Sequence, residues 1–274
     1  MTDRGAARSV QTDQTSERWL AGRHAIVTGG GRGIGAAIAN ELARRGATVT
    51  ITGRDLDRLR DTAQELSGAH GVMVAALVCD ITDADSVRSV FATAQREHGD
   101  AYILVNNAGQ SEGRPFLDTS RELWERMLAV NLTGAFTCTQ QVLGSMQRAR
   151  EGRIVNIAST SGLKGYRNIT AYCASKHGLV GLTRALAAET ARAGITVNAV
   201  CPAYTDTDMA ARAVSNVVRD MDRTEDEARA LIARSVPRGT LITPAEVAGA
   251  VAWLCSPGAT GISGQAITIA GGEI

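Results

Sequence analysis

Residues 24–46 read HAIVTGGGRGIGAAIANELARRG, and this stretch decides the fold. An apolar, strand-like run meets a cluster of glycines and passes into a helical pattern, which Gly46 closes because glycine commonly ends helices. Strand, glycine loop and helix in this order let the free amides of a helix N-terminus bind a pyrophosphate. Glycines also serve plain tight turns, but this context favours phosphate binding.

Outward from this unit, the chain keeps alternating short apolar runs with longer amphipathic ones. Further strands are expected at 47–52, 71–81, 101–109, 152–159, 195–202 and 264–272. Helices are expected at 55–68, 83–99, 120–147 (one long or two abutting), 171–194 and 243–256. Nearly all-apolar strands alternating with helices predict an α/β, doubly wound, Rossmann-type domain. Its sheet has seven mainly parallel strands, with helices on both faces and ligands beyond the carboxyl ends.

The chain is expected to consist of an N-terminal extension and one domain that contains a polar excursion. Residues 1–18 mix charged residues with Ser, Thr and Gln, and we expect a disordered or weakly ordered extension. Residues 19–274 form the single domain, without a linker of low complexity. Within it, residues 206–239 are polar and weakly periodic, which predicts two small helices in a mobile excursion that covers the substrate.

Composition excludes several classes of protein. Lys plus Arg number 29 against 28 for Asp plus Glu, so a net charge of +1 gives no case for a nucleic-acid or membrane-surface partner. The chain lacks both an apolar run of about 20 residues, the length that spans a bilayer, and a secretory signal. Five dispersed cysteines and four histidines form no metal-binding pattern and indicate reduced thiols. A cytoplasmic protein without a metal site follows.

The glycine loop and the end of the second strand bear on which dinucleotide binds. An acid about 20 residues beyond the glycines often binds the adenosine ribose hydroxyls. Gly53 stands there instead, followed by Arg54, and an arginine suits a 2′-phosphate. Arg32, inside the loop, supplies a second cation, so NADP is favoured. The alternatives are that both arginines are solvated surface charges, or that Asp55 makes an NAD-type contact.

The stretch ITAYCASKHGL, residues 169–179, carries a pair of chemical interest. Tyr172 and Lys176 are four residues apart, so they share one face of the expected helix. A nearby ammonium stabilises a phenolate, and an oxidised nicotinamide ring adds more positive charge; lowering the tyrosine pKa by about three units with these two cations corresponds to about 4 kcal/mol. Such a phenol can donate a proton to a carbonyl oxygen and take it back. Alone, this spacing also occurs in ordinary exposed pairs.

Other motifs strengthen this interpretation. TGxxxGxG from Thr28 to Gly35, NNAG at 106–109, and a serine 13 residues before Tyr172 accompany the YxxxK pair. In this combination, from about Ala21 to the C-terminus, the chain resembles the short-chain dehydrogenase/reductase family. The resemblance implies four catalytic residues: Asn131, Ser159, Tyr172 and Lys176. Ser161 competes with Ser159, whose spacing fits better, and Asn131 is expected to break its helix and hold water in a proton relay to Lys176.

The same resemblance implies a cofactor site. Asp80 and the amide of Ile81 meet the adenine, although Asp80 equally suits a turn cap. The segment CPAYTDT, residues 201–207, lines the nicotinamide, with Ala203 in place of a usual glycine. The full expected set is Thr28, Gly29, Gly31, Arg32, Gly33, Ile34, Gly35, Arg54, Asp80, Ile81, Asn107, Ala108, Gly109, Tyr172, Lys176, Pro202, Thr205 and Thr207.

Within this family, the overall sequence pattern of the chain most resembles that of 3-oxoacyl-thioester reductases and aromatic-polyketide ketoreductases. This likeness implies an NADP-dependent oxidoreductase that transfers a hydride between nicotinamide and a ketone or secondary alcohol, most specifically to a 3-oxoacyl thioester. An NAD-dependent dehydrogenase of a free small or cyclic secondary alcohol is the alternative. A dinucleotide-binding redox sensor is disfavoured, because such proteins usually lack the tyrosine or lysine that this chain keeps. By analogy with the family, a homotetramer is expected.

Overall fold

The computed structural model of the protein describes residues 18–221 and 223–274. The extension expected at residues 1–18 therefore lies almost wholly outside the described residues. The strands, listed in chain order, are β1 (His24–Thr28), β2 (Thr48–Gly53), β3 (Val74–Val78), β4 (Ala101–Asn106), β5 (Gly152–Ile157), β6 (Ile195–Pro202) and β7 (Ala266–Ile269).

These seven strands form one sheet in the order β3-β2-β1-β4-β5-β6-β7. Every neighbouring pair is parallel, so the sheet expected to be mainly parallel is wholly parallel. The order reverses between β1 and β4, and a crevice for a ligand forms at such a switch point, beyond the carboxyl ends of the strands. The predicted fold class is confirmed.

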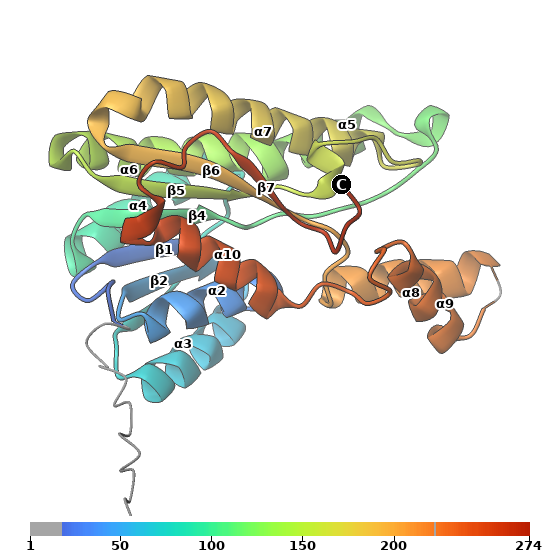
Figure 1. Ribbon diagram of the computed structural model, residues 1–274, viewed down its shortest axis with the longest axis horizontal. Helices are drawn as coiled ribbons and strands as arrows, with labels where there is room; N and C mark the ends of the chain where they lie inside the picture. Colours follow the sequence, from blue (N-terminus) through green and yellow to red (C-terminus); the bar gives the residue numbers. More distant parts are fainter. Residues whose placement is uncertain (1–17, 222) are drawn as a thin grey trace, which may run out of the picture.

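Helices cover both faces of the sheet (Figure 1). They are α2 (Gly33–Arg44), α3 (Leu56–His70), α4 (Ala84–His98), α5 (Arg121–Leu128), α6 (Gly134–Ala149), α7 (Thr170–Thr190), α8 (Asp208–Met221), α9 (Glu225–Arg234) and α10 (Pro244–Cys255). One face carries α2, α3 and α10, and the other carries α4, α6 and α7. Each layer buries its own apolar core of mostly aliphatic side chains against the strands.

The long helix expected at 120–147 is three pieces. Between α5 and α6, residues Ala129–Thr133 form a π-helical turn, in which the amide of Gly134 donates to the carbonyl of Ala129. Such a bond spans one residue more than in an α-helix, and π-turns of this kind often mark functional positions. Asn131 lies at the centre of the turn, so the expected local break in the helix is present.

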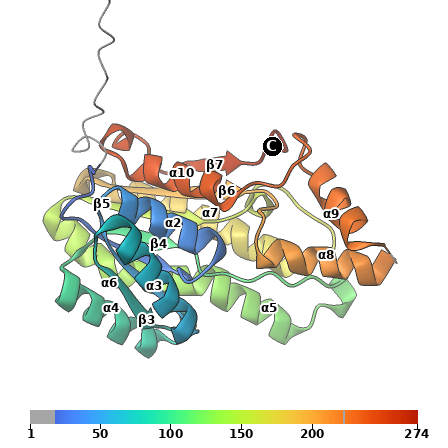
Figure 2. The same cartoon turned by 90° about the horizontal axis from the view of Figure 1, so that it is seen from below.

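Helices α8 and α9 are the two small helices expected in residues 206–239. They stand beyond the carboxyl ends of the strands, apart from the two helical layers (Figures 1 and 2). Val214 of α8 packs against Ala228 and Ile232 of α9 in a small apolar cluster of their own. Thr224 begins α9 with a capping box, which holds the helix start locally. Among the described residues, every helix is too short or too polar to cross a bilayer.

Candidate active site

The glycine loop between β1 and α2 is closed tightly on itself. Gly29 and Gly33 have φ of +66° and +53°, which side chains rarely adopt. A Cβ on Gly35 would lie 2.1 Å from the carbonyl oxygen of Gly29, so the loop has no room for a side chain there. Arg32, which caps α2, makes no side-chain capping bond. The amides of the first helical turn stay open to an anion, and the loop fits the phosphates of a dinucleotide.

A set of hydrogen bonds ties this loop to the end of β4. The Thr28 hydroxyl accepts from the amides of Asn107 and Ala108, both at 3.0 Å. The side-chain amide of Asn107 donates to the carbonyls of Thr28 and Gly29, at 2.9 and 3.1 Å. The side chains of Thr28 and Asn107 therefore hold two strand ends together. Because these side chains are engaged with the protein, Thr28 and Asn107 would contact a cofactor through their backbone atoms. That contact stays a prediction.

The expected adenosine end lies at the carboxyl ends of β2 and β3. Asp80 accepts from both the amide and the hydroxyl of Thr82, at 2.9 and 2.7 Å, which is the turn cap considered as its alternative role. The Thr82 bonds hold the pKa of the Asp80 carboxyl below its usual range, helped by the charge of Arg54. Arg54 is exposed at this edge. Arg32 is bonded to Asp208, at 2.7 Å, at the start of α8.

The catalytic residues expected from the sequence converge at the end of β5 and the first turns of α7. Ser159 follows β5, and its hydroxyl accepts from the amide of Ser161 at 3.1 Å. The Ser159 hydroxyl also lies close enough to the Tyr172 hydroxyl to lower the pKa of that phenol. Ser161, the competitor, is buried and supports Ser159 through its amide. Lys176 donates to the carbonyl of Ile157 at 2.8 Å.

In the protein alone, burial sets the pKa values of Tyr172 and Lys176. Their side chains are only 9% and 4% exposed. Burial raises the pKa of Tyr172 to about 12, and the Ser159 hydroxyl offsets part of this rise because it lowers the same pKa. Burial also lowers the pKa of Lys176 to about 8. The ammonium lies 5.7 Å from the centre of the tyrosine ring and bonds a backbone carbonyl, so in the protein alone burial outweighs any lowering of the tyrosine pKa by lysine.

Asn131 does something that its sequence position did not show. Its side chain is 2% exposed, accepts from the amide of Gln110 at 3.0 Å and donates to the carbonyl of Gln110 at 2.9 Å. The amide thus pins the backbone that follows β4. A Cβ on Gly109 would lie 2.9 Å from Asn131 Oδ1 and 3.6 Å from Lys176 Nζ, which places the three residues together. The proton relay through Asn131 stays a prediction.

The segment after β6 reaches back over the glycine loop. A Cβ on Gly33 would lie 3.3 Å from the methyl group of Thr207. The Thr205 hydroxyl donates to the carbonyl of Ala203 at 3.0 Å, and the Thr207 hydroxyl donates to that of Thr205 at 3.2 Å. Ala203 has no positive φ, so the alanine in place of a usual glycine is not strained.

Sequence reasoning missed a partly buried polar cluster next to Ser159. The Tyr166 hydroxyl hydrogen-bonds Thr160, which follows Ser159, and the carboxylate of Glu273 in the C-terminal tail. Lys164 pairs with the same carboxylate at 3.1 Å. The partners lie 107 residues apart, and no local pattern announces such a contact.

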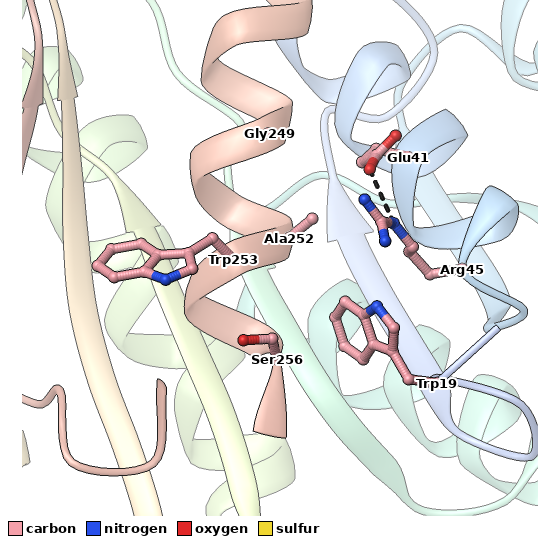
Figure 3. A pocket seen from close by; sticks show the side chains of 7 residues that line it. All are labelled: Trp19, Glu41, Arg45, Gly249, Ala252, Trp253 and Ser256. Atoms are coloured by element: carbon pink, nitrogen blue, oxygen red, sulfur yellow. Dashed lines mark hydrogen bonds and ion pairs between the residues drawn. The ribbon is translucent and has the colours of Figure 1, made fainter. Parts of the chain in front are cut away.

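A cavity of about 240 Å³ lies elsewhere, between α2 and α10 (Figure 3). It is lined by Trp19, Glu41, Arg45, Gly249, Ala252, Trp253 and Ser256. The Glu41–Arg45 ion pair closes one side of it. None of these residues belongs to the expected site. Within residues 18–221 and 223–274, no three His, Cys, Asp or Glu side chains are grouped so that they could hold a metal ion.

The parallel sheet with a glycine loop at its switch point is a dinucleotide-binding fold, and Ser159, Tyr172 and Lys176 lie together at the end of β5 and the start of α7. The pattern of the short chain dehydrogenase family matches residues 23–217, and the chain belongs to this family. It is an oxidoreductase that acts on CH–OH groups.

Similar proteins agree with this class. A putative ketoacyl reductase of the granaticin polyketide synthase from Streptomyces violaceoruber is 43% identical over 90% of this chain and 92% of its own length. The 3-oxoacyl-(acyl-carrier-protein) reductase FabG of Aquifex aeolicus is 38% identical over 92% of this chain and 98% of its own. A crystal structure of an actinorhodin polyketide ketoreductase variant with NADPH is 41% identical, covers 92% of this chain and 97% of its own, and superposes with a TM-score of 0.89.

Proposed function

We propose that the protein is an NADP-dependent ketoreductase that reduces the 3-oxo group of an acyl thioester. The observation that carries the proposal is the Ser159–Tyr172–Lys176 centre, beside a glycine loop shaped for a dinucleotide. The likeness to ketoacyl and 3-oxoacyl reductases supports the substrate class. The solved relative with NADPH supports the cofactor.

Each residue of the centre has a task that its position supports. Bound NADPH supplies the hydride. The hydroxyls of Ser159 and Tyr172 lie near each other and face the same carbonyl oxygen in this proposal. Tyr172, with its raised pKa, rests as a protonated phenol and donates that proton to the oxygen as negative charge develops there. Lys176 holds a positive charge beneath the ring and restrains the end of β5.

Cofactor contacts follow from the loop geometry. We propose that the amides at the start of α2 hold the pyrophosphate and that Arg32 and Arg54 face the 2′-phosphate. Asn131 maintains the wall of the cleft by holding Gln110. We further propose that the protein is cytoplasmic, which its five buried, free cysteines support. We also propose a homotetramer, which the family resemblance supports.

The test is the rate of NADPH consumption with acetoacetyl-CoA as a 3-oxoacyl thioester. Tyr172→Phe keeps the ring and removes the proton donor, so we expect turnover to fall by at least about 100-fold, the lower range for loss of a general acid. NADPH binding, measured by titration, stays intact. Tyr102→Phe is the matched control, because Tyr102 packs against Arg23 and Arg153 far from the centre and the same change there leaves turnover unaltered. Undiminished turnover in Tyr172→Phe contradicts the proposal.

NAD-dependent oxidation of a free secondary alcohol is the second candidate. A solved putative gluconate dehydrogenase from Agrobacterium tumefaciens, 33% identical with a TM-score of 0.86, covers 94% of this chain and 98% of its own, and favours it. Parallel assays with NAD and a panel of alcohols separate the two. Faster oxidation of an alcohol with NAD than reduction of the thioester with NADPH supports this second candidate.

A further inference from the structure

An acidic side chain pairs with Arg32, one of the two cations expected at the 2′-phosphate site, and with Arg58 beside it. Asp208 is the first residue of α8. One of its carboxylate oxygens lies 2.7 Å from the Arg32 guanidinium and 3.6 Å from that of Arg58. An oxyanion between two guanidinium groups is the arrangement that a phosphate oxygen adopts.

The two arginines belong to adjacent parts of the fold. The hydroxyl of Thr62 in α3 donates to the carbonyl of Gly31 at 3.1 Å, so the glycine loop rests directly on this helix. A Cβ on Gly31 would also lie 3.3 Å from the Leu59 side chain. Arg58 is therefore a neighbour of Arg32, and Arg54 stands at the end of the strand that leads into α3. Two cations of this edge, Arg32 and Arg58, therefore meet at Asp208, and Arg58 also pairs with Asp55 at 3.4 Å.

We propose that Asp208 is a specificity-determining residue for the cofactor, because its carboxylate competes with the 2′-phosphate for Arg32 and Arg58. A dinucleotide with a 2′-phosphate displaces Asp208, whereas one with a free 2′-hydroxyl leaves the ion pairs in place. Displacement also releases the first turn of α8 from the glycine loop. This inference rests on the proposed use of NADP.

The backbone around Asp208 allows this movement. Just before it, the amide of Asp206 donates to the carbonyl of Ile242 at 2.8 Å, and the amide of Ile242 donates to Tyr204 at 2.9 Å. These bonds fix the base of the excursion. Beyond them, this segment meets the glycine loop through the Asp208–Arg32 ion pair and through the methyl group of Thr207 against Gly33. The start of α8 can therefore shift without disturbing the sheet.

The size of the effect follows from exposure. The Arg32 and Asp208 side chains are 54% and 60% exposed, and exposed pairs of this kind are weak. Removing the competing charge raises the affinity for NADPH by about two- to fivefold, the fold-change that corresponds to up to about 1 kcal/mol. Salt screens both the pair and the phosphate, so the difference shrinks at high ionic strength.

The experiment measures the dissociation constants of NADPH and NADH for wild type and Asp208→Asn by calorimetric titration. We expect Asp208→Asn to tighten NADPH and to leave NADH unchanged. Asp206→Asn is a matched control, because Asp206 lies two residues away, pairs with Arg229 at 2.7 Å and is 50% exposed. It should change neither constant. An equal change for both cofactors, or weaker NADPH binding in Asp208→Asn, overturns the proposal.

A second measurement uses the wild-type protein, so the inference can be tested even if the Asp208→Asn variant fails to fold. The amide of Ala211 donates to Thr207 in the first turn of α8. We expect hydrogen exchange at residues 208–211 to be faster with NADPH bound than with NADH bound, and equal exchange contradicts the release of α8. Failure of the proposed function is distinguishable from failure of this inference. If the wild type binds NADH more tightly than NADPH, but Asp208→Asn still binds NADPH more tightly than the wild type does, only the cofactor assignment is rejected. Wild type that reduces thioesters with NADPH but shows no Asp208 effect rejects only this inference.

Discussion

Substituting Gly35 by alanine tests how the glycine loop is held against β4. A Cβ there would lie 2.1 Å from the Gly29 carbonyl oxygen and 2.5 Å from the Asn107 side-chain nitrogen. The first of these atoms belongs to the backbone, so it cannot swing aside as a flexible side chain does. The loop has to move away from Asn107, and the two hydrogen bonds that Asn107 donates to Thr28 and Gly29 are lost.

The magnitude follows from those two bonds. Each contributes about 0.5–1.5 kcal/mol, so their loss lowers the unfolding free energy by about 1–3 kcal/mol, to which backbone strain adds. The clash opposes the gain of up to about 1 kcal/mol that alanine brings over glycine in a helix. Gly68→Ala is a matched control, because a Cβ there meets nothing within 4 Å on α3, and it should stabilise by about 0.5–1 kcal/mol.

Urea unfolding of the wild type, Gly35→Ala, Asn107→Ala and the double variant, at one protein concentration, provides the assay. If Gly35→Ala already breaks the Asn107 bonds, Asn107→Ala adds little in that background, and the coupling is about 1–2 kcal/mol. NADPH affinity falls in Gly35→Ala as well, because the loop no longer presents its amides. Additive losses in the double variant, or a stability equal to wild type in Gly35→Ala, refute the reasoning.

Three further outcomes are expected. Burial lowers the pKa of His24, so below the ordinary histidine pKa of about 6.5 the unfolded state binds a proton that the folded state does not. The unfolding free energy therefore falls as the pH drops through 6.5. His24→Gln should reduce this pH dependence in urea titrations at pH 7.5 and 5.5. Gly109→Ala places a methyl group 2.9 Å from Asn131 Oδ1 and near Lys176, so kcat should fall by about tenfold or more, and kcat unchanged would show that the cleft tolerates the shift. Arg54→Asp should shift the kcat/KM ratio from NADPH toward NADH by about tenfold, and an unaltered ratio removes Arg54 from the phosphate site.

The fold could be predicted from the sequence because its signals are local. Apolar runs such as residues 24–28 and 195–202 are buried along their whole length, as parallel strands between two helical layers have to be. Gly46, expected to close the first helix, follows Arg45 and has φ of +93°. The break at Asn131 was expected from the family resemblance, whereas the poor fit of an asparagine to a helix interior indicated only a specific role.

The parts of the site that could not be predicted depend on contacts between distant residues. Asn131 bonds Gln110 across 21 residues, and Arg32 bonds Asp208 across 176. Neither separation has a period that a sequence pattern carries. The role expected for Asp80 was ambiguous for the opposite reason: its partner, Thr82, is two residues away, and the same short spacing suits a turn cap and an adenine contact alike.

Tyr172 shows why burial matters to the direction of catalysis, because the lowered pKa expected from the sequence needs an oxidised nicotinamide ring as a second cation beside the lysine. Spacing alone places a cation beside the phenol, but the charge balance depends on how much water the fold excludes from both groups. With a pKa of about 12, removing the proton at pH 7 costs about 7 kcal/mol at 1.36 kcal/mol per unit. Donation needs no such step, because the phenol rests protonated. The protein alone is therefore set for reduction, whereas oxidation of an alcohol requires a further positive charge next to the ring to make the phenolate accessible.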